Sequence, residues 1–355
     1  RLGAEAGWGD ARDTPGSRER SVWHPGEERP GGSLRTRFLT IPVRILSFGL
    51  AGLLALGGAA PALSQSLRPD GPPVRLYSDA TPATHPVWSP DGTRVAFTRD
   101  QYVGLWVVGA DGGAARQLAD APGAGFGFSW APDGQALVAR TARVDGLYRR
   151  HAVSMVGLDG AVTDLVQERS QMTGLPHWAG PHHVALLADG AAEVIPVDAE
   201  ARTTVPEAVV LASPRGGLVV TDPATGGLRA LPQFRDAMLL NLTPSPDGAR
   251  VAFEVYGGNL FTMRLDGSGL VDLGPGARPT WSPDGRWVAF MVTADDGHDI
   301  TSSDLVAVRA DGSERVALTQ SPDRLEMNPS WSPDGRALAF DDAVDGALYL
   351  LSVSE

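Results

Sequence analysis

Residues 281–290 read WSPDGRWVAF, residues 331–340 read WSPDGRALAF, and residues 88–97 read WSPDGTRVAF. In each copy the proline presets φ for the first central position of a turn, and the glycine can take the left-handed conformation that closes a short hairpin. The outgoing strand, for example Val95–Phe97, is apolar at successive positions, as expected of a strand covered on both faces. Each copy therefore predicts a tight hairpin in a buried sheet, and the small Ala96 would let a neighbouring sheet approach closely.

A second hairpin follows the first in each unit, as in LWVVGADGGAARQL at 105–118. Two hairpins make four antiparallel strands, and four-stranded units of about 40 to 45 residues are typical of β-propeller blades. The units start at Trp88, Trp130, Trp178, residue 208, Pro244, Trp281 and Trp331. We therefore predict an all-β fold, a seven-bladed β-propeller of four-stranded antiparallel sheets over residues 74–355. The alternative is a six-bladed propeller with one blade expanded by an extra hairpin.

The two ends of the propeller region predict how the ring closes. The last unit stops after its third strand, ALYLLSVSE at 347–355, and residues 74–78 resemble the end of other units. We expect the N-terminal strand to complete the last blade, which leaves no open end between sheets.

The consensus WSPDG-x-x-[VL]-A-F resembles the WD40-like repeat of the TolB-type propeller family, over most of residues 74–355. The resemblance implies a periplasmic or secreted propeller that works by binding proteins or other ligands. TolB itself has a separate α/β domain before its propeller. We expect this chain to lack that domain, because only residues 63–73 separate the expected signal cleavage from the first strand. The same repeats also occur in propellers fused to serine peptidases and in a few lyases.

The N-terminal part of the chain has a different composition. Residues 1–34 are polar, Gly/Pro-rich and without a period, which indicates a disordered leader or a start site assigned too far upstream. Arg35, Arg37 and Arg44 then precede an apolar run, and this order is typical of a signal peptide. We predict a signal peptide over residues 35–62.

Small residues at Ala60 and Ala62 favour cleavage after Ala62, with Ser64 as the second choice, followed by a linker at 63–73. The alternative is an uncleaved membrane anchor, although a spanning helix needs about 20 strongly apolar residues and this run is thinned by Gly and Ala. In both cases we expect a periplasmic or secreted propeller, whose membrane contact would come only from an uncleaved signal.

Charge and composition exclude several classes of function. Residues 65–355 hold 22 Arg and 36 Asp or Glu, a net charge of −14, so the body repels phosphate backbones and we expect no nucleic-acid partner. The chain has no cysteine, and therefore no disulfide, thiolate metal site or cysteine nucleophile. It also has no G-x-S-x-G pentapeptide, the nucleophile elbow of α/β-hydrolases.

We therefore predict a monomeric binding module without catalysis, whose partner is an envelope protein or a small ligand. The alternative is a metal-dependent lyase or hydrolase that acts on a carbohydrate at the mouth of the propeller channel. A third class, purely structural assembly at the cell envelope, also fits the repeat. We expect no cofactor.

Function in a propeller usually lies on loops around the channel mouth, because the strands serve packing. Two sets of loops reach that end: those that join blades, and those between the second and third strands. Arginine and tyrosine are the side chains most often energetic at interfaces. The candidate binding residues on these loops are Arg99, Asp100, Tyr102, Arg143, Tyr148, Arg169, Arg235, Arg324 and Glu326.

Two candidate metal sites are weaker. The acidic loop 293–304 offers Asp295, Asp296 and Asp299 as hard oxygen ligands for Ca²⁺, but their spacing matches no EF-hand and a solvated loop is commoner. His177, His182 and His183 are close in sequence, yet adjacent residues of a strand point to opposite faces, which favours a role in a turn over a metal site. The aspartates and tryptophans of the repeat itself are expected to be structural.

Overall fold

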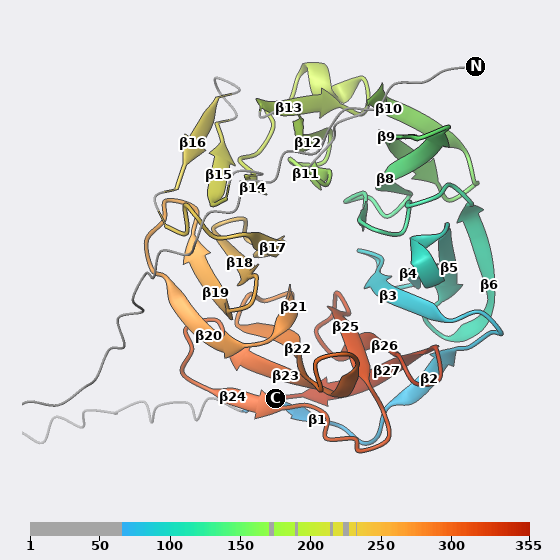
Figure 1. Cartoon of the computed structure of the whole chain (residues 1–355), viewed down its shortest axis with the longest axis vertical. Helices are drawn as coiled ribbons and strands as arrows, with labels where there is room; N and C mark the ends of the chain where they lie inside the picture. The colour runs from blue at the N-terminus through green and yellow to red at the C-terminus, as the bar shows by residue number, and fades with distance from the viewer. Residues whose placement is uncertain (1–65, 170–173, 189–190, 214–215, 223–226, 232) are drawn as a thin grey trace, which may run out of the picture. The chain divides into compact units, whose positions relative to one another are not determined.

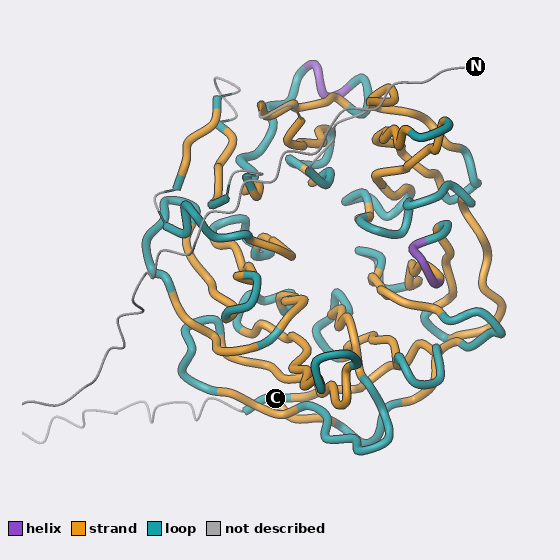
Figure 2. Tube along the Cα trace, in the orientation of Figure 1, coloured by secondary structure: helices purple, strands orange, loops and turns teal. Residues whose placement is uncertain are grey.

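The structure is a computed structural model that describes residues 66–169, 174–188, 191–213, 216–222, 227–231 and 233–355. The predicted leader and signal peptide lie outside the described residues. Strands dominate, and the helical elements of the described part are the short 3₁₀ turns η1 (Asp100–Tyr102) and η2 (Glu200–Arg202) (Figure 2). None of the helices described is long or apolar enough to cross a bilayer.

Seven antiparallel sheets follow one another around a central axis (Figure 1). The first two blades contain β3 (Ala83–Trp88), β4 (Arg94–Arg99), β5 (Leu105–Gly109) and β6 (Gly112–Ala119), then β7 (Phe128–Trp130), β8 (Ala136–Asp145), β9 (Tyr148–Gly157) and β10 (Val162–Arg169). In blades 3 and 4 the structure describes three strands each: β11 (His177–Trp178), β12 (His183–Ala188) and β13 (Ala191–Pro196), then β14 (Val210–Ala212), β15 (Leu218–Thr221) and β16 (Leu228–Ala230).

The C-terminal half repeats the pattern with complete blades. Blades 5 and 6 contain β17 (Leu239–Pro244), β18 (Arg250–Val255), β19 (Asn259–Arg264) and β20 (Val271–Pro275), then β21 (Ala277–Trp281), β22 (Trp287–Asp295), β23 (Ile300–Arg309) and β24 (Arg315–Ala317). Blade 7 contains β25 (Glu326–Trp331), β26 (Ala337–Asp342) and β27 (Ala347–Ser354). The seven-bladed propeller is confirmed, and the six-bladed alternative is wrong.

The N-terminal strand closes the ring as expected. β2 (Val74–Tyr77) pairs antiparallel with β27, with Val74 opposite Leu350 (Figure 1). A further strand, β1 (Arg68–Pro69), pairs with the end of β27. Leu67 is 3% exposed and packs between blades 6 and 7. The described end of the predicted linker is therefore part of the propeller, because an apolar side chain and an unpaired strand edge were available there.

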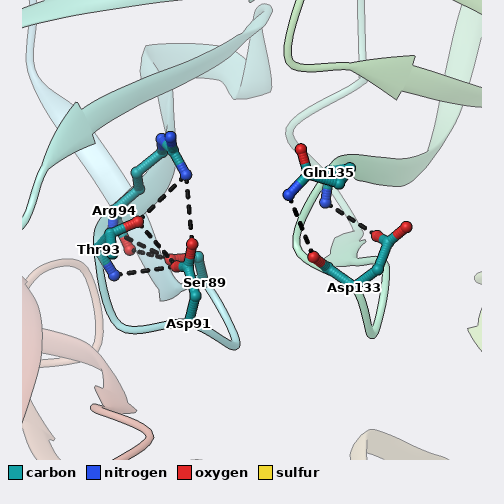
Figure 3. Close-up of polar contacts among 6 residues, drawn as sticks. All are labelled: Ser89, Asp91, Thr93, Arg94, Asp133 and Gln135. Carbon is teal, nitrogen blue, oxygen red and sulfur yellow. Dashed lines mark hydrogen bonds and ion pairs between the residues drawn. The ribbon is translucent and has the colours of Figure 1, made fainter.

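The repeated turn has the predicted geometry (Figure 3). Gly92 has φ +68° and its amide donates to the Ser89 carbonyl, at 2.9 Å. The Ser89 hydroxyl donates to Asp91 (2.6 Å) and accepts from the Arg94 amide (3.0 Å), so serine and aspartate together hold the hairpin closed. Blade 2 has alanine in place of serine, and there Asp133 still accepts from the Gln135 amide, at 2.9 Å. The aspartates of the repeat are structural.

One buried apolar cluster lies at each of the seven contacts between neighbouring blades. The Ala-Phe pair of the repeat is split between two clusters, because successive strand residues point to opposite faces. Phe340 packs in the cluster shared with blade 6, whereas Ala339 lies in the cluster shared with blade 1. A large side chain of one blade thus meets a small one of the blade before it.

The tryptophan that ends the first strand also connects blades. Trp130 Nε1 donates to the carbonyl of Val87 in blade 1, at 3.0 Å. Trp281 Nε1 donates in the same way to Thr243 in blade 5, at 2.9 Å. Trp331 is as deeply buried, at 7% exposed, but among the described residues its Nε1 finds no acceptor. The tryptophans are packing residues, and some of them add a hydrogen bond between blades.

This difference gives a test of the bond between blades. Trp281→Phe loses apolar area and the hydrogen bond, whereas Trp331→Phe loses a similar area and a donor that is not satisfied. We expect Trp281→Phe to lower the free energy of unfolding in urea by about 1 kcal/mol more than Trp331→Phe does. Equal losses in the two variants would show that the indole bond contributes nothing.

Candidate functional site

Four of the innermost strands have a bulge at the same place, three residues before the tryptophan position. The residues there are non-glycine with positive φ: His85 (57°), Asn241 (50°), Arg278 (58°) and Asn328 (50°). Each coincides with a shift in the pairing of the first and second strands. Such a conformation is uncommon outside glycine and is often associated with functional sites. Blades 5, 6, 7 and 1 therefore present one equivalent position each toward one end of the axis.

We call this end the loop end, because the blade connections and the loops between second and third strands lie there. The opposite end carries the WSPDG turns and is called the turn end. The assignment follows from antiparallel pairing, since the first strand of each blade runs from the loop end to the turn end.

Asp341 is the centre of the polar contacts at the loop end. Its carboxylate is 4% exposed and accepts from the Asn328 side-chain amide at 2.9 Å. It also accepts from the His85 backbone amide and from the Thr84 hydroxyl, both at 3.0 Å. Blade 7 thus supplies the acceptor, and blade 1 supplies two of the donors.

Burial and a nearby cation set the charges of this group. Burial raises the pKa of Asp341 to about 6, although its hydrogen bonds and the positive charge of Arg278 act in the opposite direction. Burial, and secondarily the charge of Arg278, lowers the pKa of His85 to about 3, so its imidazole is neutral at pH 7. Arg278 of blade 6 therefore lies close enough to act electrostatically on both blade 7 and blade 1.

An aromatic row continues from His85 toward blade 2. The His85 ring meets the edge of Tyr102, with centroids 5.3 Å apart, and Tyr102 meets Phe126 at the same centroid distance. Phe126 is 45% exposed, and the guanidinium carbon of Arg140 lies 5.2 Å from its ring centroid. We call His85, Tyr102, Arg278, Asn328 and Asp341, together with Phe126, the axial cluster. It combines a cation, a buried carboxylate, a neutral imidazole and an accessible aromatic surface.

The candidate residues from the sequence are spread over the loop end and its margins, and Tyr102 is the one in the axial cluster. Arg99 is only 13% exposed in its side chain, because it binds Asp79 at 2.7 Å and lies 4.0 Å from the Trp106 ring centroid. Asp100 is exposed and accepts from the Gln101 amide.

Other candidates lie farther round the ring. Arg143 and Tyr148 are exposed on the β8–β9 hairpin, and Arg143 is 3.6 Å from Glu168. Arg169 pairs with Glu193 and so connects blades 2 and 3. Arg235 is exposed before β17.

The two candidates next to the start of the last blade, Arg324 and Glu326, are more deeply buried than residues of an accessible binding loop. Arg324 lies over the Tyr349 ring, with its guanidinium carbon 4.2 Å from the centroid. Glu326 is 0% exposed at the start of β25, so its prediction as an accessible loop residue is wrong. Burial raises the pKa of this carboxyl group. The sequence shows that an acidic residue occurs at this position, but it does not show that the fold buries it.

The described residues contain no group of three or more histidines or acids placed to hold a metal ion. In the acidic loop, Asp295 and Asp296 accept from backbone amides of the same loop, at 2.9 Å. The histidines of blade 3 do not form one group. His177 and His183 occupy neighbouring strands, where burial lowers the pKa of His177 to about 4, while His182 pairs with Asp198 at 2.8 Å.

A cavity of about 590 Å³ lies at the turn end, between blades 6 and 7. Its polar walls already pair with one another: Arg286 binds Asp284 and Glu355, and the Trp287 indole donates to Glu355 at 2.7 Å. The axial cluster is the better candidate site, because its cation and its aromatic surface have contacts left to make.

Sequence reasoning missed His85, Arg278, Asn328, Asp341 and Phe126. The signal was present in the positions where the repeats differ. The residue three before the tryptophan and the residue after the Ala-Phe pair change from blade to blade, while the turn between them stays constant.

A comparison with solved structures supports the propeller fold. No family model matches the chain. A solved TolB structure from Agrobacterium tumefaciens is similar with a TM-score of 0.51 and 18% identity, over 78% of this chain and 92% of that chain. An oligogalacturonate lyase from Vibrio parahaemolyticus gives a TM-score of 0.44 and 14% identity, with the same coverage of 78% and 92%. The fold of this protein is therefore a β-propeller similar to that of the TolB structure.

One curated protein shares a short stretch of sequence. It is the uncharacterized peptidase YuxL of Bacillus subtilis (strain 168), 36% identical over 70 residues. The match covers 18% of this chain and 10% of the peptidase, so the two share a segment rather than a whole protein.

The opposite pKa shifts of Asp341 and His85 predict opposite pH dependence. Ionising the buried Asp341 opposes folding, so its contribution to stability falls as pH rises from about 4 to about 6. Protonating His85 also opposes folding, so its contribution falls as pH drops from about 6.5 toward 3. Relative to the wild type, Asp341→Asn should gain up to about 3 kcal/mol in unfolding free energy between pH 4 and pH 6.

The matched variant is His85→Asn, because asparagine occupies this position in blades 5 and 7. Its stability relative to the wild type should change in the opposite direction over the same range. Urea unfolding at pH 4, 5, 6 and 7 measures both. A pH-independent difference for Asp341→Asn would show that this carboxyl group titrates normally.

Proposed function

We propose that this protein is an exported TolB-like β-propeller that binds a partner or ligand at its loop end, through the axial cluster, and carries out no chemistry of its own. The observation that carries the proposal is the convergence of three blades on one site. Arg278, Asp341 and His85 come from blades 6, 7 and 1 and interact electrostatically.

The rest of the scaffold supports a role in binding. The strands serve the packing between blades, so the residues of the loop end can differ from blade to blade. Phe126 is an accessible aromatic side chain beside the cluster, and aromatic residues often anchor interfaces. Export to the periplasm or the exterior rests on the signal-like sequence at 35–62 and on the fold shared with TolB.

The alternative is a lyase or hydrolase that acts on a carbohydrate at the same end. One feature favours it: the cation Arg278 acts electrostatically on groups of two neighbouring blades, and a cation in such a place can stabilise a negative charge that develops on a substrate. Carbohydrate breakdown by the purified protein, lost in Arg278→Asn, would favour this alternative over the binding module.

Affinity capture from the native envelope fraction tests the binding role. Phe126→Ala removes the aromatic surface at the loop end, and Leu270→Ala is its matched control, since both side chains are 45% exposed and Leu270 lies at the turn end. We expect Phe126→Ala to reduce recovery of the captured partner at least tenfold, which corresponds to about 1.4 kcal/mol. Leu270→Ala should behave as the wild type. Loss in the control alone would move the site to the turn end.

Export has its own test. Protein recovered from the periplasm or the medium should begin at Leu63, the residue after the expected cleavage, or at Gln65 for the second choice. Mass spectrometry of the intact protein decides between these ends. Recovery of uncleaved protein in the membrane fraction would show an anchor instead.

A further inference from the structure

The four bulged strands differ in the hydrogen-bond partner of the side chain at the bulge. In blade 7, Asn328 donates to Asp341, thirteen residues later, at 2.9 Å. In blade 5, Asn241 donates to Glu254 at the same spacing, at 2.7 Å. Two blades therefore carry the same closed pair, an asparagine amide on a carboxylate of the adjacent strand.

Blade 6 breaks this pattern at both positions. Arg278 replaces the asparagine, and Met291 replaces the carboxylate, so a larger donor set coincides with the loss of its acceptor. Met291 is 9% exposed and faces Ala277 in the pairing of β21 with β22. Arginine offers five N–H donors in a planar fork and stays charged at any physiological pH.

The neighbouring blades do not supply the missing acceptor. Asp341 acts on Arg278 through space, but its oxygens already accept from Thr84, His85 and Asn328. Within the described residues, no hydrogen bond or ion pair joins the Arg278 guanidinium to another group. The side chain is half-buried, so water solvates it only in part.

We infer that Arg278 is a receptor for the carboxylate of a ligand, and that an apolar or aromatic group next to that carboxylate packs on Tyr102 and Phe126. This inference rests on the proposed binding role of the axial cluster and specifies what is bound. A carboxylate matches the guanidinium fork through two parallel hydrogen bonds. The His85 ring contacts Tyr102, and the charge of Arg278 acts on the same ring, so a charged and an apolar contact zone adjoin one imidazole.

A singly charged carboxylate fits this position better than a phosphate. The body of the protein has a net charge of −14 over residues 65–355, and the Asp341 carboxylate interacts electrostatically with Arg278. A doubly charged group would meet more repulsion from both than a carboxylate does. Recognition therefore depends on short-range pairing with Arg278 and on apolar contact.

The probe is N-acetylphenylalanine, which has one carboxylate and one aromatic ring, and its control is N-acetylphenylalaninamide, which lacks the charge. Ligand-observed NMR titrations give the two dissociation constants, and for a fragment of this size we expect the acid to bind on the order of 1 mM. Arg278→Asn installs the residue that blades 5 and 7 tolerate at the same positive φ, so the fold should be retained. Arg336→Asn makes the same change at an exposed position of the turn end.

We expect Arg278→Asn to weaken binding of the acid at least tenfold, Arg336→Asn to change it less than twofold, and the amide to bind the wild type no better than it binds Arg278→Asn. Equal binding of acid and amide, or of wild type and Arg278→Asn, would overturn the inference. A phosphate that binds as tightly as the acid would overturn the choice of ligand class. If binding of the acid did not depend on Arg278 but capture of the partner still required Phe126, the proposed function would stand. If capture did not require Phe126, the proposed function would be wrong.

Discussion

The contact between a phenylalanine of one blade and an alanine of the blade before it is the interaction on which this structure depends. Phe97, Phe290 and Phe340 are all 0% exposed, and each shares a cluster with an alanine of the preceding blade. A closed ring allows no interface to be thicker than the others without opening another. Size complementarity at every contact is therefore a condition of closure, beyond its contribution to apolar burial.

This condition explains why the fold could be predicted from the sequence. The Ser-Pro-Asp-Gly turn and the Ala-Phe pair must be repeated for geometric reasons, so their spacing counts the blades. Blade 4, which lacks the tryptophan, was still recognisable, because its sequence alternates short apolar strands, observed as β14 and β15, with turns. The extent of the N-terminal closure was less evident, since β1 has two residues and no motif.

The candidate site could not be predicted in the same way. Its residues occupy positions that the repeat leaves variable, and no single blade shows that these positions converge on the axis. Tyr102 was found because it lies on a loop, whereas Arg278 and His85 lie within strands, where the sequence suggests packing. Arg99 shows the opposite case. Its place next to a loop suggested an accessible binding residue, but the Asp79 carboxylate and the Trp106 indole hold its side chain against the blade.

Ring closure and the candidate site share a residue. Asp341 accepts hydrogen bonds from Thr84 and His85 across the contact between the last and the first blade, which is the contact made by the two ends of the propeller. The same carboxylate interacts electrostatically with Arg278. A ligand that neutralises Arg278 changes the field at Asp341 and so the stability of the closing contact, while any loosening of that contact moves His85 and its aromatic neighbours. Binding energy gained at the loop end is therefore coupled to the closed form of the ring.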